Sequence, residues 1–237
     1  MFTLFFVAPE ELNHDRIELH GPAAHHAISV LRVKVNELIR LADGQGKWIE
    51  GPVTHIERGA LQVEVRLRGA DPAPKVSVTI AQALLKGENQ KAALDQLVQA
   101  GVDSIIPWQA QRSVGALDKS QKWRDVVIAA AQQSRRAQIP TLAPLMDCAA
   151  MLALRSEFDC TIAFHESGNI SLNDVNAISS ARSVLAIIGP EGGLSEAELE
   201  LLRSAQIPLV KLGNPVIRAD LAGAVALGGL KVLTKEW

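Results

Sequence analysis

The sequence predicts an α/β protein in which a small β-rich region, residues 1–70, precedes a larger region, residues 75–237, built on a parallel sheet. Two patterns predict this class. Residues 61–69 read LQVEVRLRG, where apolar and polar side chains alternate, so one strand face is buried and the other is wet. After residue 75, wholly apolar strands alternate with helices, which is typical of a parallel sheet covered on both faces.

The first region is predicted to be an antiparallel sheet or small barrel with one helix. The expected strands are the N-terminal MFTLFFV, residues 38–41, residues 47–57 and residues 61–69, and the expected helix spans residues 22–32. The segment GADPAP, residues 69–74, then breaks any regular element with two prolines and a glycine, so we place the linker there.

The second region is predicted to alternate between strands and helices. Its strands are expected at residues 76–84, 104–108, 160–164, 184–188 and 207–212. Its helices are expected at residues 87–100, 122–136, 148–156, 196–205 and 220–235. Gly101 follows the first of these helices in the position that commonly ends a helix.

Composition limits the possible functions. The 237 residues are 48% hydrophobic and 21% charged, with a net charge of −2, so nucleic-acid binding would need a local basic face. Cys148 and Cys160 are too few for a disulfide framework, and no cluster has zinc spacing, so we expect no metal. Because neither a signal peptide nor a membrane-spanning stretch is apparent, we expect a cytoplasmic protein.

The most informative stretch is VLAIIGPEGGLSEAELELL, residues 184–202, where a buried strand stops at Gly189-Pro190 and a helix follows. Ser195 stands three residues before Glu198, which predicts a capping box at the helix start. One interpretation is a well-made strand-to-helix junction, and the other is a turn that binds a ligand.

The residues of this turn exclude some ligands. A P-loop is excluded because Leu194-Ser195 stands where Lys followed by Ser or Thr is needed. The G-x-x-G-G spacing is not that of a dinucleotide site, and Glu191 would repel a pyrophosphate near the backbone N–H groups. A neutral or cationic ligand that approaches bare backbone fits better, and S-adenosylmethionine meets this description.

Two further strand ends belong to the same edge of the sheet. His165-Glu166 follows one strand, and Gly213-Asn214-Pro215 follows another and leads to Arg218 near the start of the last helix. Ligands bind beyond the carboxyl ends of strands in open α/β sheets, so the three loops can form one pocket. A cation at a helix N-terminus is unfavourable, so Arg218 has either a functional role or an ion pair with Asp220.

These motifs together resemble the RsmE family of the SPOUT methyltransferase superfamily. The resemblance rests on IGPEGGLS and LGNPVIRADLAGAVAL, and it extends to VLRVKVNELIRLADG, ALLKGENQKAALDQLVQAGVDSIIPW and AAAQQSRRAQIP, in order along nearly the whole chain. It implies a PUA-like β-barrel domain in residues 1–70 and, in residues 75–237, a methyltransferase domain with a C-terminal trefoil knot. It also implies a homodimer that uses S-adenosylmethionine, without a metal, to methylate N3 of one uridine in 16S ribosomal RNA near the decoding site of the small subunit.

The resemblance also assigns residues. Cofactor contacts carry over to Leu84, Phe164, His165, Ile188, Gly189, Glu191, Gly192, Gly193, Leu212, Gly213, Val216 and Ile217. The chain departs from the family where Pro215 replaces an arginine, where Ala219 and Leu221 replace threonines, and at Leu4, where an arginine is common.

Methylation at N3 requires loss of a proton and stabilisation of negative charge on the uracil oxygens. Arg218 and Asp220 are the expected catalytic residues. Arg218 is an electrostatic partner and not a base, because its guanidinium stays protonated. Asp220, Glu191 and His165 are all possible proton acceptors.

The expected RNA contacts are local groups of cations. They are Arg32, Lys34, Lys47, Arg112, Arg135 and Arg136. The main alternative is an RNA-binding protein with an inactive methyltransferase domain, which the altered segment 214–221 favours. A nicotinamide oxidoreductase is a distant third, because the glycine spacing and Glu191 oppose it.

Overall fold

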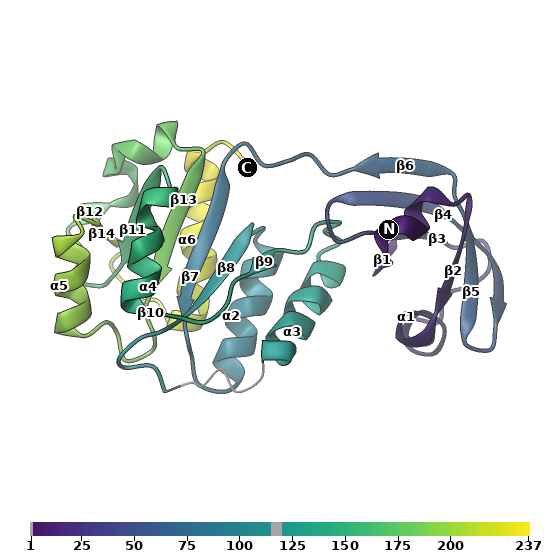
Figure 1. Ribbon diagram of the computed structural model, residues 1–237, viewed down its shortest axis with the longest axis horizontal. Coiled ribbons are helices and arrows are strands. Elements are labelled where there is room, and N and C mark those ends of the chain that lie inside the picture. Colours follow the sequence, from purple (N-terminus) through teal and green to yellow (C-terminus); the bar gives the residue numbers. More distant parts are fainter. Residues whose placement is uncertain (1, 115–119) are drawn as a thin grey trace. The chain divides into compact units, whose positions relative to one another are not determined.

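The computed structural model describes residues 2–114 and 120–237. The chain forms two compact units (Figure 1). The first unit contains residues 1–73 and 131–139, and the second contains residues 74–130 and 140–237. The first unit therefore includes a segment that comes from the middle of the second, which the sequence analysis did not predict.

The first unit is a six-stranded sheet in the order β1-β3-β4-β5-β2, with β6 also paired to β4. The strands are β1 (Thr3–Phe6), β2 (Arg16–His20), β3 (Leu38–Ala42), β4 (Lys47–Glu57), β5 (Ala60–Glu64) and β6 (Leu67–Ala70). All pairs are antiparallel except β1 with β3. The short helical segments are η1 (Pro9–Asn13), α1 (Gly21–His25) and the π-helical η2 (His26–Val30).

The predicted bounds of one strand and one helix in this unit were wrong. The expected strand 61–69 is two strands, because the backbone N–H groups of Val65 and Arg66 bond Asp15 and Glu50 instead of continuing one ladder. The expected helix 22–32 changes to a π-helix after His25, and Arg32 ends it with a left-handed φ of 55°. Strand β2 was not predicted.

The core of the first unit collects the inward-facing side chains of its strands. Its larger fully buried members are Phe5, Ile17, Ile39, Leu41, Ile49 and Leu61. Each such side chain contributes about 1.5–3 kcal/mol when it leaves water. The inserted segment adds Ala137, which packs against Leu4 and Ala42 and donates its backbone N–H to Asp71.

The second unit is an eight-stranded sheet in the order β10-β8-β7-β13-β11-β14-β12, with β9 beside β8. Every pair is parallel, which confirms the predicted sheet. The long strands are β7 (Ser77–Ala83), β8 (Ser104–Gln109), β11 (Cys160–Phe164), β13 (Ser183–Ile188) and β14 (Leu209–Lys211). Three two-residue strands were not predicted: β9 (Thr141–Leu142), β10 (Met146–Asp147) and β12 (Ile170–Ser171).

Helices cover both faces of this sheet (Figure 1). Helices α4 (Cys148–Ala153) and α5 (Glu196–Ser204) pack on one face, where Ala81 and Ala83 of β7 join their core. Helices α2 (Glu88–Gln99) and α6 (Ala219–Leu233) contact each other on the opposite face. They come close because Gly223 of α6 lacks a Cβ, which would stand 3.0 Å from both Gln82 and Leu97.

Helix α3 (Ser120–Gln133) begins two residues earlier and ends three residues earlier than the predicted helix, residues 122–136. It cannot extend to Arg136, because Arg135 has a left-handed φ of 59°, which no α-helix continues. Three 3₁₀ segments, η3 (Leu154–Glu157), η4 (Leu172–Asp174) and η5 (Asn176–Ser180), complete the unit.

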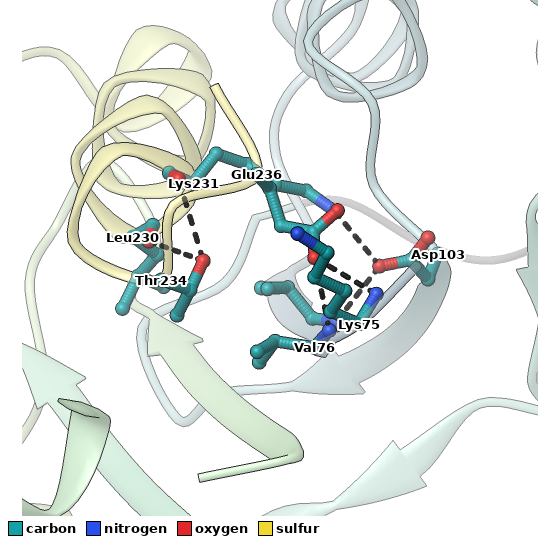
Figure 2. A network of polar contacts seen from close by, with 8 residues as sticks. Lys75, Val76, Asp103, Leu230, Lys231, Thr234 and Glu236 are labelled. Carbon is teal, nitrogen blue, oxygen red and sulfur yellow. Dashed lines mark hydrogen bonds and ion pairs between the residues drawn. The ribbon is translucent and has the colours of Figure 1, made fainter. Parts of the chain in front are cut away.

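The C-terminal residues tie the last helix to the start of the sheet (Figure 2). Lys231, only 4% exposed, places its Nζ 3.1 Å from Oδ2 of Asp103. Glu236 accepts hydrogen bonds from the backbone N–H groups of Lys75 and Val76, at 2.8 and 3.2 Å. These contacts fix the chain where it enters β7.

Within the described residues, no helix is long and apolar enough to span a membrane. The trefoil knot stays a prediction.

Candidate active site

The carboxyl ends of three neighbouring strands open into a cavity of about 630 Å³. Phe164, the last residue of β11, is in register with both Ile188 at the end of β13 and Val210 of β14, so the three loops start at one level. The buried Trp108 fixes this edge, because its Nε1 donates to the Ile188 carbonyl at 3.1 Å.

Eleven of the twelve predicted cofactor contacts line this cavity. They are Phe164, His165, Ile188, Gly189, Glu191, Gly192, Gly193, Leu212, Gly213, Val216 and Ile217. Leu84 does not line it: the side chain is 1% exposed and lies in the core at the end of β7.

The glycine turn after β13 is held from within and from a neighbouring loop. The Gly193 N–H donates to the Pro190 carbonyl at 2.9 Å, and Gly193 has a left-handed φ of 69°, which favours glycine. Nη1 of Arg112 donates to the carbonyls of Gly192 and Leu194, at 3.1 and 3.2 Å. Arg112 was predicted to contact RNA, but here its guanidinium supports the turn.

The predicted capping box at the start of α5 is confirmed. Oγ of Ser195 accepts from the Glu198 N–H at 3.2 Å, and the Glu198 carboxylate accepts from the Ser195 N–H at 2.8 Å. Glu198 is 5% exposed, and its other oxygen accepts from the Gln111 N–H at 2.7 Å. Glu198 therefore also fastens the loop that carries Arg112.

The carboxylate of Glu191 is anchored to the start of α2. One of its oxygens accepts from the Lys86 backbone N–H at 3.1 Å and from the Asn89 side-chain amide at 3.0 Å. Burial alone would raise the pKa of Glu191, but hydrogen bonds from the Asn89 side chain and from backbone N–H groups outweigh it and lower the pKa. A carboxylate with a lowered pKa is a weaker proton acceptor.

Arg218 and Asp220 form a two-point ion pair at the start of α6. Nε of Arg218 lies 3.0 Å from one oxygen of Asp220, and Nη2 lies 2.8 Å from the other. Asp220 is 8% exposed, whereas 73% of the Arg218 side chain is exposed. The pair offsets the unfavourable placement of a cation at a helix N-terminus, and it occupies both oxygens of the Asp220 carboxylate.

His165 is contacted by Ser167 in the next turn of chain. Its Nδ1 accepts from the Ser167 N–H at 3.2 Å and contacts the Ser167 hydroxyl at 2.7 Å. A neutral ring with Nδ1 as acceptor carries its proton on Nε2, where it can only donate. Each of the three predicted proton acceptors is thus already engaged.

The charged side chains that line the cavity are nearly balanced. Three are cationic, Arg112, Lys211 and Arg218, and four are anionic, Glu166, Glu191, Glu196 and Asp220, which gives 3 − 4 = −1. This balance suits a neutral or cationic ligand better than a pyrophosphate.

Three polar residues of this lining were not predicted from the sequence: Asn89, Lys211 and Glu196. Asn89 could have been found, because it follows the carboxyl end of β7 and so reaches the same sheet edge. Among the described residues, no group of three His, Cys, Asp or Glu side chains could hold a metal ion.

The structure divides the predicted RNA contacts between the two units. Arg32, Lys34, Lys47, Arg135 and Arg136 belong to the first unit, and Arg112 belongs to the second. Arg32, Lys34 and Lys47 are exposed, whereas the Arg135 guanidinium lies 5.9 Å from the centre of the Phe2 ring.

Comparison with known families gives the class of this fold and site. Residues 72–231 match the model of the RNA methyltransferase domain, and residues 19–66 match the model of the RNA methyltransferase PUA domain. Both matches agree with the resemblance seen in the motifs.

Curated relatives narrow the class. Ribosomal RNA small subunit methyltransferase E of Mycobacterium bovis is 35% identical over 92% of this chain and 86% of its own length. The Bacillus subtilis protein of the same name is 27% identical over 95% of both chains. The crystal structure of the Neisseria gonorrhoeae protein of that name, bound to S-adenosyl methionine, has a TM-score of 0.87, 24% identity and 98% coverage of both chains. The chain belongs to the family of ribosomal RNA small subunit methyltransferase E.

Proposed function

We propose that this protein methylates N3 of one uridine in 16S ribosomal RNA, near the decoding site of the small subunit, with S-adenosylmethionine as methyl donor. The observation that carries the proposal is the cavity at the carboxyl edge of the sheet, where a bare glycine turn and the Arg218 guanidinium line one space. Family membership and the names of the relatives support the substrate class.

The cavity residues fit such a donor. A Cβ on Gly189 would stand 3.1 Å from the Leu194 side chain, and one on Gly192 would stand 3.2 Å from Cβ of Arg112, so a larger residue at either position would crowd the side chains that support the turn. When bound, S-adenosylmethionine supplies an electrophilic methyl group on a sulfonium. The turn at Gly189–Gly193 and the segment Leu212–Ile217 would hold it through main-chain groups, and the nearly balanced charge of the lining is compatible with its positive charge.

Arg218 is the proposed catalytic residue. The methyl group leaves the sulfur and bonds to N3, and the N3 proton passes to an acceptor, for which Asp220, Glu191 and His165 remain the candidates. Loss of this proton puts negative charge on the uracil oxygens, and a fixed guanidinium beside them can lower the barrier by about 3 kcal/mol. Asp220 holds that guanidinium at two points and thereby orients it. Further contacts to RNA phosphates are proposed for Arg32, Lys34, Arg135 and Arg136.

The proposal includes a homodimer. Three exposed apolar side chains of α6, Leu221, Val225 and Val232, follow one another at spacings of four and seven residues, which places them on one helix face. Val216 at the cavity is 76% exposed. A second copy of this chain would cover this apolar face.

The test is transfer of a labelled methyl group to small ribosomal subunits that lack the modification, with the modified base mapped by mass spectrometry. We expect incorporation at uracil N3 and, for Arg218→Ala, about a 100-fold lower kcat with donor affinity within threefold. Arg32→Ala and Lys34→Ala each remove a proposed phosphate contact and weaken RNA binding. As the salt concentration is raised, both variants should therefore lose methyl transfer at a lower concentration than the wild type. Binding of subunits without methyl incorporation would instead favour an RNA-binding protein with an inactive domain.

A further inference from the structure

Asn89 joins the glycine turn to the arginine at the start of α6. Its Nδ2 donates to Glu191 at 3.0 Å, and its Oδ1 accepts from Nη2 of Arg218 at 3.4 Å. We propose that Asn89 is a positioning residue that, together with Asp220, sets the orientation of the Arg218 guanidinium relative to the turn. This inference rests on the proposed function.

The charges on either side fix the orientation of the amide. Its NH₂ group faces the Glu191 carboxylate and its oxygen faces the Arg218 guanidinium. A flipped amide would place a donor against a cation and an acceptor against an anion. Asn89 therefore matches both neighbours in one orientation only.

The contact between Asn89 and Arg218 affects which N–H groups of the guanidinium are available to a substrate. Nε and one hydrogen of Nη2 point to Asp220, and the second hydrogen of Nη2 points to Asn89. Among the described residues Nη1 makes no hydrogen bond, so its two N–H groups remain for a substrate oxygen. Because most of the Arg218 side chain is exposed, these polar contacts and not packing hold it.

The turn has other supports, whereas without Asn89 the Arg218 guanidinium keeps only its two bonds to Asp220 among the described residues. Glu191 keeps the bond from the Lys86 N–H if Asn89 is removed, and Arg112 still holds Gly192. Loss of Asn89 should therefore disturb the guanidinium more than the donor-binding turn. The expected signature is a fall in kcat without a matching fall in donor affinity.

The first experiment compares Asn89→Ala with Gln99→Ala, a matched control that removes an amide from the exposed far end of the same helix. For Asn89→Ala we expect at least a tenfold lower kcat for methyl transfer, with the donor Kd within threefold by calorimetry. Gln99→Ala should keep both values. An unchanged kcat in Asn89→Ala would overturn the inference.

A polarity swap gives a sharper test. Asn89→Asp sets two carboxylates against each other, so it should be as inactive as Asn89→Ala. Adding Glu191→Gln supplies an amide that can donate to the new carboxylate, which still accepts from Arg218. The double variant should recover at least fivefold over Asn89→Asp, and a failure to recover would contradict the proposal.

A measurement without turnover separates this inference from the proposed function. Nitrogen NMR follows rotation of the Arg218 Nη groups, with signals identified by their loss in Arg218→Lys. Asn89→Ala should speed this rotation and Gln99→Ala should not, whether or not the protein methylates RNA. Equal rotation in the wild type and Asn89→Ala would refute the positioning role, while absent methyl transfer in the wild type would refute only the proposed function.

Discussion

The Glu191 carboxylate is held by residues that are far from it in the sequence. The sequence places a carboxylate in a glycine turn, which is enough to disfavour a bound pyrophosphate. Its partners Lys86 and Asn89 stand 105 and 102 positions earlier in the chain, and only the pairing of β7 with β13 brings them close. The local residues were therefore enough to argue against a bound pyrophosphate, whereas the hydrogen bonds that lower the carboxyl pKa were not predictable.

Because its pKa is lowered, Glu191 should stabilise the folded protein at neutral pH and lose this contribution in acid. A carboxyl whose pKa is lower in the folded than in the unfolded state contributes stability above its ordinary value of 4.5, and that contribution is lost as the pH falls through the folded pKa. We expect Glu191→Gln to narrow the difference in unfolding free energy between pH 6 and pH 3. Urea unfolding at several pH values measures this, and parallel profiles for both proteins would contradict the assignment.

The start of α5 is determined by the four residues 195–198. The capping box was predicted from Ser195 and Glu198 alone because both of its hydrogen bonds are local. The break between β5 and β6 was not predicted, because the alternation of residues 61–69 continues through it. Only the partners of Val65 and Arg66, which lie on other segments, end the strand.

Glu198 should matter more than Ser195 for the stability of α5. Ser195→Ala removes one cap and should cost about 1 kcal/mol. Glu198→Ala also leaves the buried N–H of Ser195 and that of Gln111 without their acceptor, so it should cost roughly 2–3 kcal/mol.

Urea unfolding of both variants gives these two free energies. Glu200→Ala is the matched control, since its side chain is exposed on the same helix and, among the described residues, makes only a 3.5 Å ion pair with Arg203. It should change stability by less than about 0.5 kcal/mol. Equal losses for Ser195→Ala and Glu198→Ala would show that the tie to Gln111 contributes little.

Across the whole chain, the alternation of strands and helices predicted the parallel sheet and the edge at which its loops meet. It did not predict that residues 131–139 pack with the first unit, because that association depends on contacts such as Ala137 with Leu4 and Ala42. Small apolar residues of this kind give no periodic signal. Leu84 was assigned to the cofactor site by resemblance alone, and its side chain lies in the core.

The exposed face of α6 carries the last prediction. Leu221, Val225 and Val232 are 45%, 39% and 59% exposed, and Trp237 lies over Gly228 on the same side of the helix. Apolar residues gathered on one face of a helix mark an interaction site, unlike single exposed ones. Sedimentation should give twice the chain mass of 25.5 kDa for the wild type and the monomer mass for Val225→Glu. Leu201→Glu, at a position on α5 that is 47% exposed, should remain dimeric, and a dimer that survives Val225→Glu would place the interface elsewhere.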